Sequence, residues 1–239
     1  MKLEIKNLIV ETDGKIVVND VSFVVESGET HVLMGANGSG KTSLVNTLAG
    51  HPKYKITQGE ILLDGKDVSK SYVDERAKLG MFLSMQILPE IEGVTLANFL
   101  YTAYKGLKGG EISVLDFYKY LEQKADSVGI NKEFLKRELN VGFSGGEKKQ
   151  SEILQLLALE PKFAFLDEID SGVDIDAINK VFAGIEQLRK KGAAFLLVTH
   201  DANILDKITP DTVYVMKDGK IIESGDKKLI EKIKKEGFN

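Results

Sequence analysis

The chain has 239 residues, of which 43% are hydrophobic and 28% charged, and its formal net charge is −4. That length can bury one sizeable core, and the acidic balance argues against nucleic-acid partners and against docking on anionic lipid. No cysteine is present, so disulfides and thiolate-ligated clusters within the chain are excluded. The sequence has no apolar run of the ~18 residues that a membrane span needs and no signal-peptide core. We therefore expect a cytoplasmic protein with no direct membrane insertion.

The first fifty residues predict three strands and a helix. Residues 2–10 and 16–25 read as two strands around the turn Asp13-Gly14, because apolar and polar residues alternate in them. A short apolar strand over 30–34 then runs into a glycine-rich turn, and a helix over 41–49 follows. This strand–turn–helix order is the one in which phosphate-binding loops occur.

The middle of the chain changes character. Residues 60–63 and 80–85 read as strands, whereas the pattern is helical from about 95 to 160, with apolar side chains such as Leu96 and Leu100 at helical spacing. We expect one domain over 1–239, in which a helical subdomain (about 91–159) is inserted into a core lobe (about 1–90 and 160–239).

Strand signals return in the last third. Residues 163–167 and 194–199 are apolar runs with a helix between them, and 213–222 reads as a hairpin with a glycine turn. The lysine-rich segment 227–235 predicts a terminal helix with one solvated face. Alternating strands and helices indicate an α/β fold whose sheet is parallel at its centre, with ligands at the carboxyl ends of the strands.

The segment Gly35–Thr42 matches the phosphate-binding pattern G-x-x-x-x-G-K-[ST] at every position. Its glycines let backbone N–H groups surround phosphates, and the following helix directs its positive end at them. Lys41 is expected to bridge the β- and γ-phosphates, and Thr42 to offer its hydroxyl to Mg²⁺. The residues expected to bind the nucleotide here are Gly35, Ala36, Asn37, Gly38, Ser39, Gly40, Lys41, Thr42 and Ser43.

Two adjacent carboxylates end the apolar strand that begins at Phe163. Asp167 is expected to hold the metal, and Glu168 to position the attacking water. Neighbouring acids at a strand end are often only the start of a loop. Their position beyond a phosphate-binding loop favours catalysis.

The segment Phe143–Glu147 places a serine and two glycines at the start of a helix, which suits a phosphate. It resembles the signature of ABC-type ATPases, usually Leu-Ser-Gly-Gly-Gln, and it precedes the carboxylate strand as it does in that family. The resemblance implies that Ser144, Gly145 and Gly146 bind ATP held by a second copy, in an ATP-dependent head-to-tail homodimer. It also implies an ABC nucleotide-binding domain with a mixed sheet core, an antiparallel β edge and an inserted helical subdomain.

Three further positions match motifs of the same family. Gln86 matches the glutamine that contacts Mg²⁺ and senses the partner, and Asp170–Asp174 matches the loop that crosses the dimer interface. His200 matches the histidine that contacts the γ-phosphate. The resemblance thus implies Mg²⁺-dependent ATP hydrolysis, with Lys41, Gln86, Glu168 and His200 as catalytic residues and Thr42, Gln86 and Asp167 as metal ligands.

The resemblance is closest to the ATPase subunit (SufC) of the Suf iron–sulfur cluster assembly machinery. It is carried by Gly80–Gln86, Gly142–Lys149 and Leu166–Gly172, where transport ATPases typically read Asp-Glu-Pro-Thr/Ser after the strand. The chain departs from the Suf pattern at Leu88 and Glu92, where prolines are usual. The resemblance implies SufB- and SufD-like scaffold partners, which would supply the cluster ligands that this cysteine-free chain lacks.

Three questions stay open at the level of sequence. The chain could instead be the ATP-binding subunit of a membrane transporter, or a nucleotide-gated binding module that hardly hydrolyses. The residues 11–14 before the second strand include no aromatic to stack on adenine, so a preference for ATP over GTP rests on the family alone. Lys148 or Lys149 could pair with Glu168 at rest.

Overall fold

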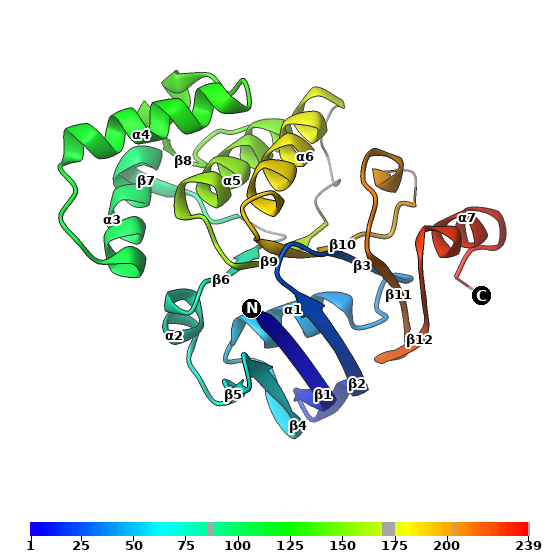
Figure 1. The fold of residues 1–239 in the computed structure, drawn as a ribbon. Coiled ribbons are helices and arrows are strands. Elements are labelled where there is room, and N and C mark those ends of the chain that lie inside the picture. Colours follow the sequence, from blue (N-terminus) through cyan, green and yellow to red (C-terminus); the bar gives the residue numbers. More distant parts are fainter. Residues whose placement is uncertain (86–87, 169–174, 203, 239) are drawn as a thin grey trace.

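The computed structural model describes residues 1–85, 88–168, 175–202 and 204–238. Two larger sheets and the helices are arranged in layers, and a third sheet has only two strands (Figure 1). Helix α1 (Lys41–Ala49) lies between a six-stranded sheet and a four-stranded antiparallel sheet. Helices α3 (Leu96–Lys108), α4 (Val114–Ser127), α5 (Gly145–Leu159) and α6 (Ile175–Arg189) gather on the opposite side of the six-stranded sheet, and α7 (Lys227–Glu236) stands at the C-terminal end.

The antiparallel sheet has the order β2-β1-β4-β5. Its strands are β1 (Lys2–Thr12), β2 (Lys15–Glu26), β4 (Lys55–Leu63) and β5 (Lys66–Asp67). Alternate residues of β1 and β2, among them Leu3, Ile5, Val21 and Val25, are buried against α1 and the larger sheet. This period of two is the expected pattern for a sheet with one face in the core.

The six-stranded sheet has the order β12-β11-β3-β10-β9-β6. Its strands are β3 (Thr30–Met34), β6 (Met81–Ser84), β9 (Phe163–Asp167), β10 (Ala194–Val198), β11 (Thr212–Lys217) and β12 (Lys220–Gly225). Every residue of the three central strands β3, β10 and β9 is buried, since both faces of the sheet are covered. All neighbours pair in parallel except β12, which pairs antiparallel with β11.

The remaining elements are mostly helical. The helices are α2 (Val73–Lys78), α3 (Leu96–Lys108), α4 (Val114–Ser127), α5 (Gly145–Leu159), α6 (Ile175–Arg189) and α7 (Lys227–Glu236), with 3₁₀ turns at Lys132–Lys136 and Ile204–Lys207. Two short strands, β7 (Ile91–Thr95) and β8 (Glu138–Leu139), pair with each other. Within the described ranges, no helix has the length and apolar character needed to cross a membrane.

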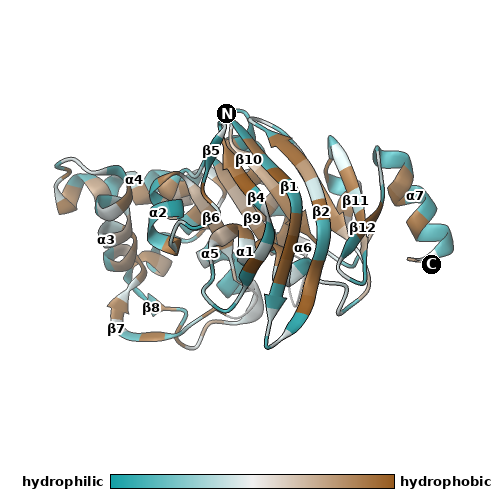
Figure 2. Ribbon diagram, turned by 90° about the horizontal axis from the view of Figure 1, so that it is seen from below, coloured by the Kyte–Doolittle hydropathy of each residue, from teal (hydrophilic) through white to brown (hydrophobic). Residues whose placement is uncertain are grey.

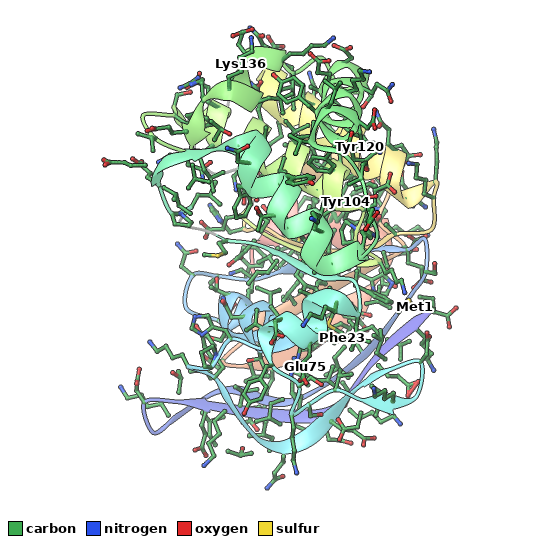
Figure 3. All side chains as sticks on the ribbon, turned by 90° about the vertical axis from the view of Figure 1, so that its left-hand side faces the viewer. Met1, Phe23, Glu75, Tyr104, Tyr120 and Lys136 are labelled. Carbon is green, nitrogen blue, oxygen red and sulfur yellow. The ribbon has the colours of Figure 1, made fainter. Side chains whose placement is uncertain are left out.

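Hydrophobic side chains form two clusters, one on each face of the six-stranded sheet. Figure 2 shows brown, hydrophobic residues along the strands β1 and β2, and it shows α7 with both brown and teal residues. In α7, Leu229, Ile230 and Ile233 are buried and the lysines lie outside. On α3 and α4, the rings of Tyr104 and Tyr120 pack in a tilted arrangement with their centroids 5.9 Å apart (Figure 3). The central sheet is thus held rigidly from both sides, which fixes the loops at its carboxyl edge.

The predicted fold class is confirmed: the chain has a mixed α/β architecture with an antiparallel edge strand, and most of its antiparallel strands form a sheet of their own. Three details differ from the prediction. Strand β4 begins at Lys55 because it pairs with β1 along a polar stretch, α2 was not predicted, and the helical region is interrupted by β8. The division into two lobes stays a prediction.

Candidate functional site

The loop between β3 and α1 wraps around the ammonium group of Lys41. The glycines Gly35, Gly38 and Gly40 have φ values of +153°, +81° and +106°, a region that side chains rarely adopt. The Lys41 Nζ donates to Gly35 O at 2.7 Å and to Ala36 O at 2.9 Å. Burial lowers the pKa of Lys41, an effect that the nearby carboxylates Asp167 and Glu168 oppose. The loop therefore holds the Lys41 ammonium at the place where the sequence motif predicts that phosphates bind.

The hairpin β11–β12 supports this loop from outside. A Cβ on Gly35 would lie 2.2 Å from Met216 O in this hairpin, and one on Gly40 would lie 2.5 Å from Val17 O in the neighbouring strand β2, so both glycines are required by close backbone contact. The N–H of Gly219 donates to Ser39 O at 2.9 Å. The shape of the loop is therefore set partly by a hairpin about 180 residues away in the sequence.

The strand order brings the other predicted groups to the same edge. Strand β10 lies between β3 and β9, so the loop after β3, the carboxylates at the end of β9 and His200 after β10 meet at the carboxyl ends of adjacent strands. The Glu168 N–H donates to Val198 O at 3.0 Å, and Glu168 has a φ of +49°. A non-glycine residue in that region is strained, and such residues gather at functional sites. His200 is exposed.

A cavity of about 570 Å³ opens over the phosphate loop, a size that suits a nucleotide. We call it the phosphate cavity; it is lined by Ile16, Val17, Asn37, Gly38, Gly40, Lys41, Thr42, Ser43, Glu168, Asp218 and Gly219. Sequence reasoning found the loop residues and Glu168 but missed the contributions of β2 and of the hairpin turn. Those contributions depend on long-range packing. Of these contributions, only Ile16 carries a signal in the sequence, because it directly follows the residues 11–15 that contain no aromatic side chain.

Ile16 is 56% exposed and offers an apolar wall where the cavity leaves the phosphate loop. Replacing it by tyrosine is expected to tighten nucleotide binding about five- to tenfold, because an aromatic ring stacks on a base better than an isoleucine does. A fluorescent-nucleotide titration checks this. The matched control is Ile222→Tyr on β12, also exposed, and equal gains in both variants would contradict the assignment.

Asp167 and Thr42 form the polar pair expected of a metal site. The Thr42 hydroxyl donates to the Asp167 carboxylate, whose pKa is raised, chiefly by burial. The Asp167 Oδ1 is buried without a hydrogen-bond partner, which is costly unless a ligand completes the site. Carboxylate and hydroxyl oxygens are donors that Mg²⁺ prefers. The two residues therefore fit a magnesium ion.

Replacing Asp167 by asparagine is expected to raise the melting temperature measured in EDTA at neutral pH. A raised pKa means that the folded state binds the Asp167 proton more tightly than the unfolded state does, so stability is lost as pH rises through the folded pKa. The asparagine variant escapes this loss, and its advantage should shrink as the pH falls. Thermal melts from pH 4 to 8 check this; an asparagine variant less stable at every pH would contradict it.

The start of α5 is a complete capping box. The Ser144 Oγ accepts from Glu147 N at 3.3 Å, while Glu147 Oε2 accepts from Ser144 N at 2.8 Å. Arg137 donates to Glu147 Oε1 at 2.6 Å and stacks over the Phe143 ring at 4.1 Å. Arg137 and the Ser144 N–H together hold the pKa of Glu147 below its usual value. Phe143 and Glu147 thus fix the first turn of α5, which the glycines leave open.

The signature segment does not line the phosphate cavity of its own chain: of Ser144, Gly145 and Gly146, all described, none borders it. Gln86 and Asp170–Asp174 lie outside the described residues. A single chain therefore brings together the phosphate loop, Asp167 and Glu168, with His200 at the same edge, and leaves the signature elsewhere.

Comparison with known proteins decides the family. The ABC transporter family matches residues 18–171, more than half of the chain. The chain belongs to the ABC transporter family. As a member of this family, it is an ATPase and binds ATP.

Relatives match this ABC protein over nearly its whole length. A probable ABC transporter ATP-binding protein of Streptococcus pyogenes is 49% identical over 238 residues, which cover 99% of this chain and 93% of the relative. Vegetative protein 296 of Bacillus subtilis is 46% identical, covering 99% and 92%. A probable ATP-dependent transporter of Synechocystis is 45% identical, covering 99% and 94%.

Solved ABC cassettes share the fold. An ATP-binding subunit of an ABC transporter superposes with a TM-score of 0.83 at 24% identity, covering 100% of this chain and 94% of that one. A dimeric ATP-binding cassette in a post-hydrolysis state, bound to ADP and phosphate, gives 0.83 at 21% identity, covering 94% and 98%.

A buried polar cluster links α5 of this ABC ATPase to β6, and sequence reasoning missed it. The Ser84 hydroxyl donates to Glu152 Oε1 at 2.5 Å, and Lys149 Nζ lies 2.8 Å from Glu152 Oε2. Lys148 instead pairs with Glu90 at 2.9 Å. Both lysines thus have acidic neighbours other than Glu168, and a pairing of either with Glu168 stays a prediction. The signal in the sequence is that Glu152 lies among the apolar positions of α5, next to Ile153 and one turn before Leu156.

Proposed function

We propose that this ATPase is the energy-supplying subunit of a Suf-type iron–sulfur cluster assembly complex. ATP binding closes two copies head-to-tail, and the closure changes the conformation of SufB- and SufD-like scaffold partners. The carrying observation is the run Asp167-Glu168-Ile169-Asp170, which resembles the Suf subunit where transport ATPases typically have Asp-Glu-Pro-Thr/Ser. The absence of cysteine supports the same assignment, because cluster ligands must then come from a partner.

We assign the roles at the site as follows. Lys41 and the loop N–H groups bind the β- and γ-phosphates, and Thr42 and Asp167 hold Mg²⁺, which neutralises charge on the transferred phosphoryl group when bound. Glu168 orients the attacking water and takes its proton, and Gln86 and His200 complete the site. The cavity lined by Lys41, Thr42 and Glu168 supports this assignment.

The proposed dimer would bring the N-terminus of α5 to a phosphate cavity, which a single chain does not do. Hydrolysis needs charge stabilisation around the γ-phosphate, and a helix N-terminus with free N–H groups supplies it. The start of α5 is such a terminus, but it does not border the phosphate cavity of its own chain. In a head-to-tail pair, each α5 would face the nucleotide of the other copy.

A groove beside the site supports a partner-driven role. It has a volume of about 480 Å³ and a mostly apolar lining. This apolar groove is lined by Thr42, Asn46, Ala49, His51, Val73, Ala77, Met81, Phe82, Leu83, Ser84, Met85, Leu107, Leu159 and Asp167. On the same side of the molecule, Tyr72 is 76% exposed and Met85 45%, and Met85 directly precedes Gln86. We propose that an apolar segment of the scaffold subunit docks there.

Affinity purification of the tagged chain from its own host tests the proposal. We expect soluble scaffold proteins that carry iron and sulfide, and we expect Met85→Glu to reduce their recovery. The matched control is Ile222→Glu, an exposed isoleucine on β12. Recovery of an integral membrane protein without a soluble scaffold would contradict the Suf assignment.

The alternative is the ATP-binding subunit of an ABC membrane transporter. The names of the relatives in Streptococcus pyogenes and Synechocystis favour it. The two candidates share the nucleotide site and differ in what the apolar groove binds, so the same purification separates them.

A further inference from the structure

Arg76, on the short helix α2, is buried although it carries a charge. It is 2% exposed, and within the described part of the chain its guanidinium donates to main-chain carbonyls. Nη1 donates to Thr47 O at 2.7 Å and to Leu48 O at 2.8 Å. Nε donates to Ser71 O at 3.1 Å and Nη2 to Ser69 O at 2.9 Å. Within the described ranges, no carboxylate forms an ion pair with this guanidinium.

Two of these acceptors belong to the last turn of α1. The carbonyls at a helix C-terminus have no partners within the helix and carry its negative end, so a cation there is stabilising. The approach requires Gly50, which has a φ of +85° and where a Cβ would lie 3.1 Å from the Arg76 side chain. Arg76 thus ties the end of α1 to the segment that leads into α2.

The other end of α1 begins at Lys41, in the phosphate loop. The helix has nine residues, so its two ends are about 13 Å apart within one continuous hydrogen-bonded element. No acidic residue and no side-chain cap occupies its first turn, which leaves its N–H groups to a ligand. A shift of the C-terminal end of α1 therefore moves the phosphate-binding end.

Helix α2 also borders the apolar groove. Val73 and Ala77 line the groove from α2, and Ala49 and His51 line it from the end of α1. In Figure 3, α2, marked by Glu75, lies between the helical layer and the antiparallel sheet. Whatever fills the groove touches both elements that Arg76 holds together.

We propose that Arg76 is a positioning residue that couples occupancy of the apolar groove to nucleotide affinity at the phosphate loop, through α1. The inference rests on one part of the proposed function, namely that a partner docks in the apolar groove. It does not depend on the partner being a Suf scaffold. By linkage, any ligand that shifts α2 changes ATP affinity, and ATP changes the affinity of that ligand by the same factor.

The first test measures the dissociation constant for a fluorescent ATP analogue together with the melting temperature. We expect Arg76→Met to raise that constant about fivefold or more, and Arg76→Lys to recover part of the loss because a cation remains. The control is Lys78→Met on the same helix, whose exposed ammonium pairs with Asp74 at 3.0 Å; we expect an unchanged constant. Wild-type affinity in folded Arg76→Met would overturn the proposal.

The second test separates coupling from a purely structural role. Since the chain has no cysteine, Val73→Cys creates a unique site at which pyrene maleimide can fill the groove. We expect labelling to change ATP affinity at least about threefold with Arg76 present and much less in the Val73→Cys, Arg76→Lys double variant. The control position is Ile222→Cys, labelled in the same way. Equal effects in both Arg76 backgrounds would overturn the coupling, and neither outcome depends on which partner is purified.

Discussion

Replacing Lys41 by alanine is expected to reduce ATP turnover about a hundredfold to a thousandfold. The Lys41 ammonium is the cation at the centre of the phosphate loop, held by two loop carbonyls at 2.7 and 2.9 Å. Its buried position means that nucleotide phosphates meet it with little water between, where charge stabilisation is strong. Phosphate release under saturating Mg²⁺ and ATP checks the turnover.

The control for Lys41→Ala is Lys53→Ala, which removes an exposed lysine that pairs with Asp13 at 3.3 Å. We expect Lys53→Ala to hydrolyse ATP at the wild-type rate. A melting curve must show that Lys41→Ala is folded, because the variant also removes the two hydrogen bonds that close the loop. An unchanged rate in a folded Lys41→Ala would contradict the role of the loop.

Part of the candidate site could be predicted because its chemistry is local in sequence. The loop Gly35–Thr42 needs only the strand before it and the helix after it, and both are encoded within about ten residues on each side. The pair Asp167-Glu168 was found for the same reason, at the end of one apolar strand. Parallel strand order then places both segments at one edge of the sheet.

The rest depends on contacts between distant segments. The Arg76 guanidinium binds Thr47 O and Leu48 O, almost thirty positions earlier, and no periodic pattern marks the six-residue helix that carries it. Ile16 lines the phosphate cavity only because the antiparallel sheet packs over α1. The polar start of β4 gave no strand signal because its register is set by pairing with β1. Tertiary packing overrides local propensity at all of these positions.

Replacing Glu168 by glutamine is expected to slow hydrolysis about a hundredfold or more while leaving ATP binding intact. Glutamine keeps the size of the side chain but cannot accept a proton from the attacking water. The backbone at Glu168 has a φ near +49°. Glutamate and glutamine adopt this conformation at a similar cost, so the loop should keep its conformation in the variant. Single-turnover hydrolysis and a nucleotide titration on the same preparation separate the chemical step from binding.

The same variant tests the proposed dimer, because blocked hydrolysis should leave the ATP-bound state populated. Sedimentation with Mg²⁺ and ATP is expected to show a dimer for Glu168→Gln and mainly monomer without nucleotide. Glu133→Gln, an exposed acid that pairs with Lys136 at 2.7 Å, is the matched control and should turn over normally. Full turnover in Glu168→Gln would remove Glu168 from the mechanism. Slow turnover of Glu168→Gln without an ATP-dependent dimer would support Glu168 as the base. The same result would contradict the proposed closure of two chains, because hydrolysis would then take place in a single chain.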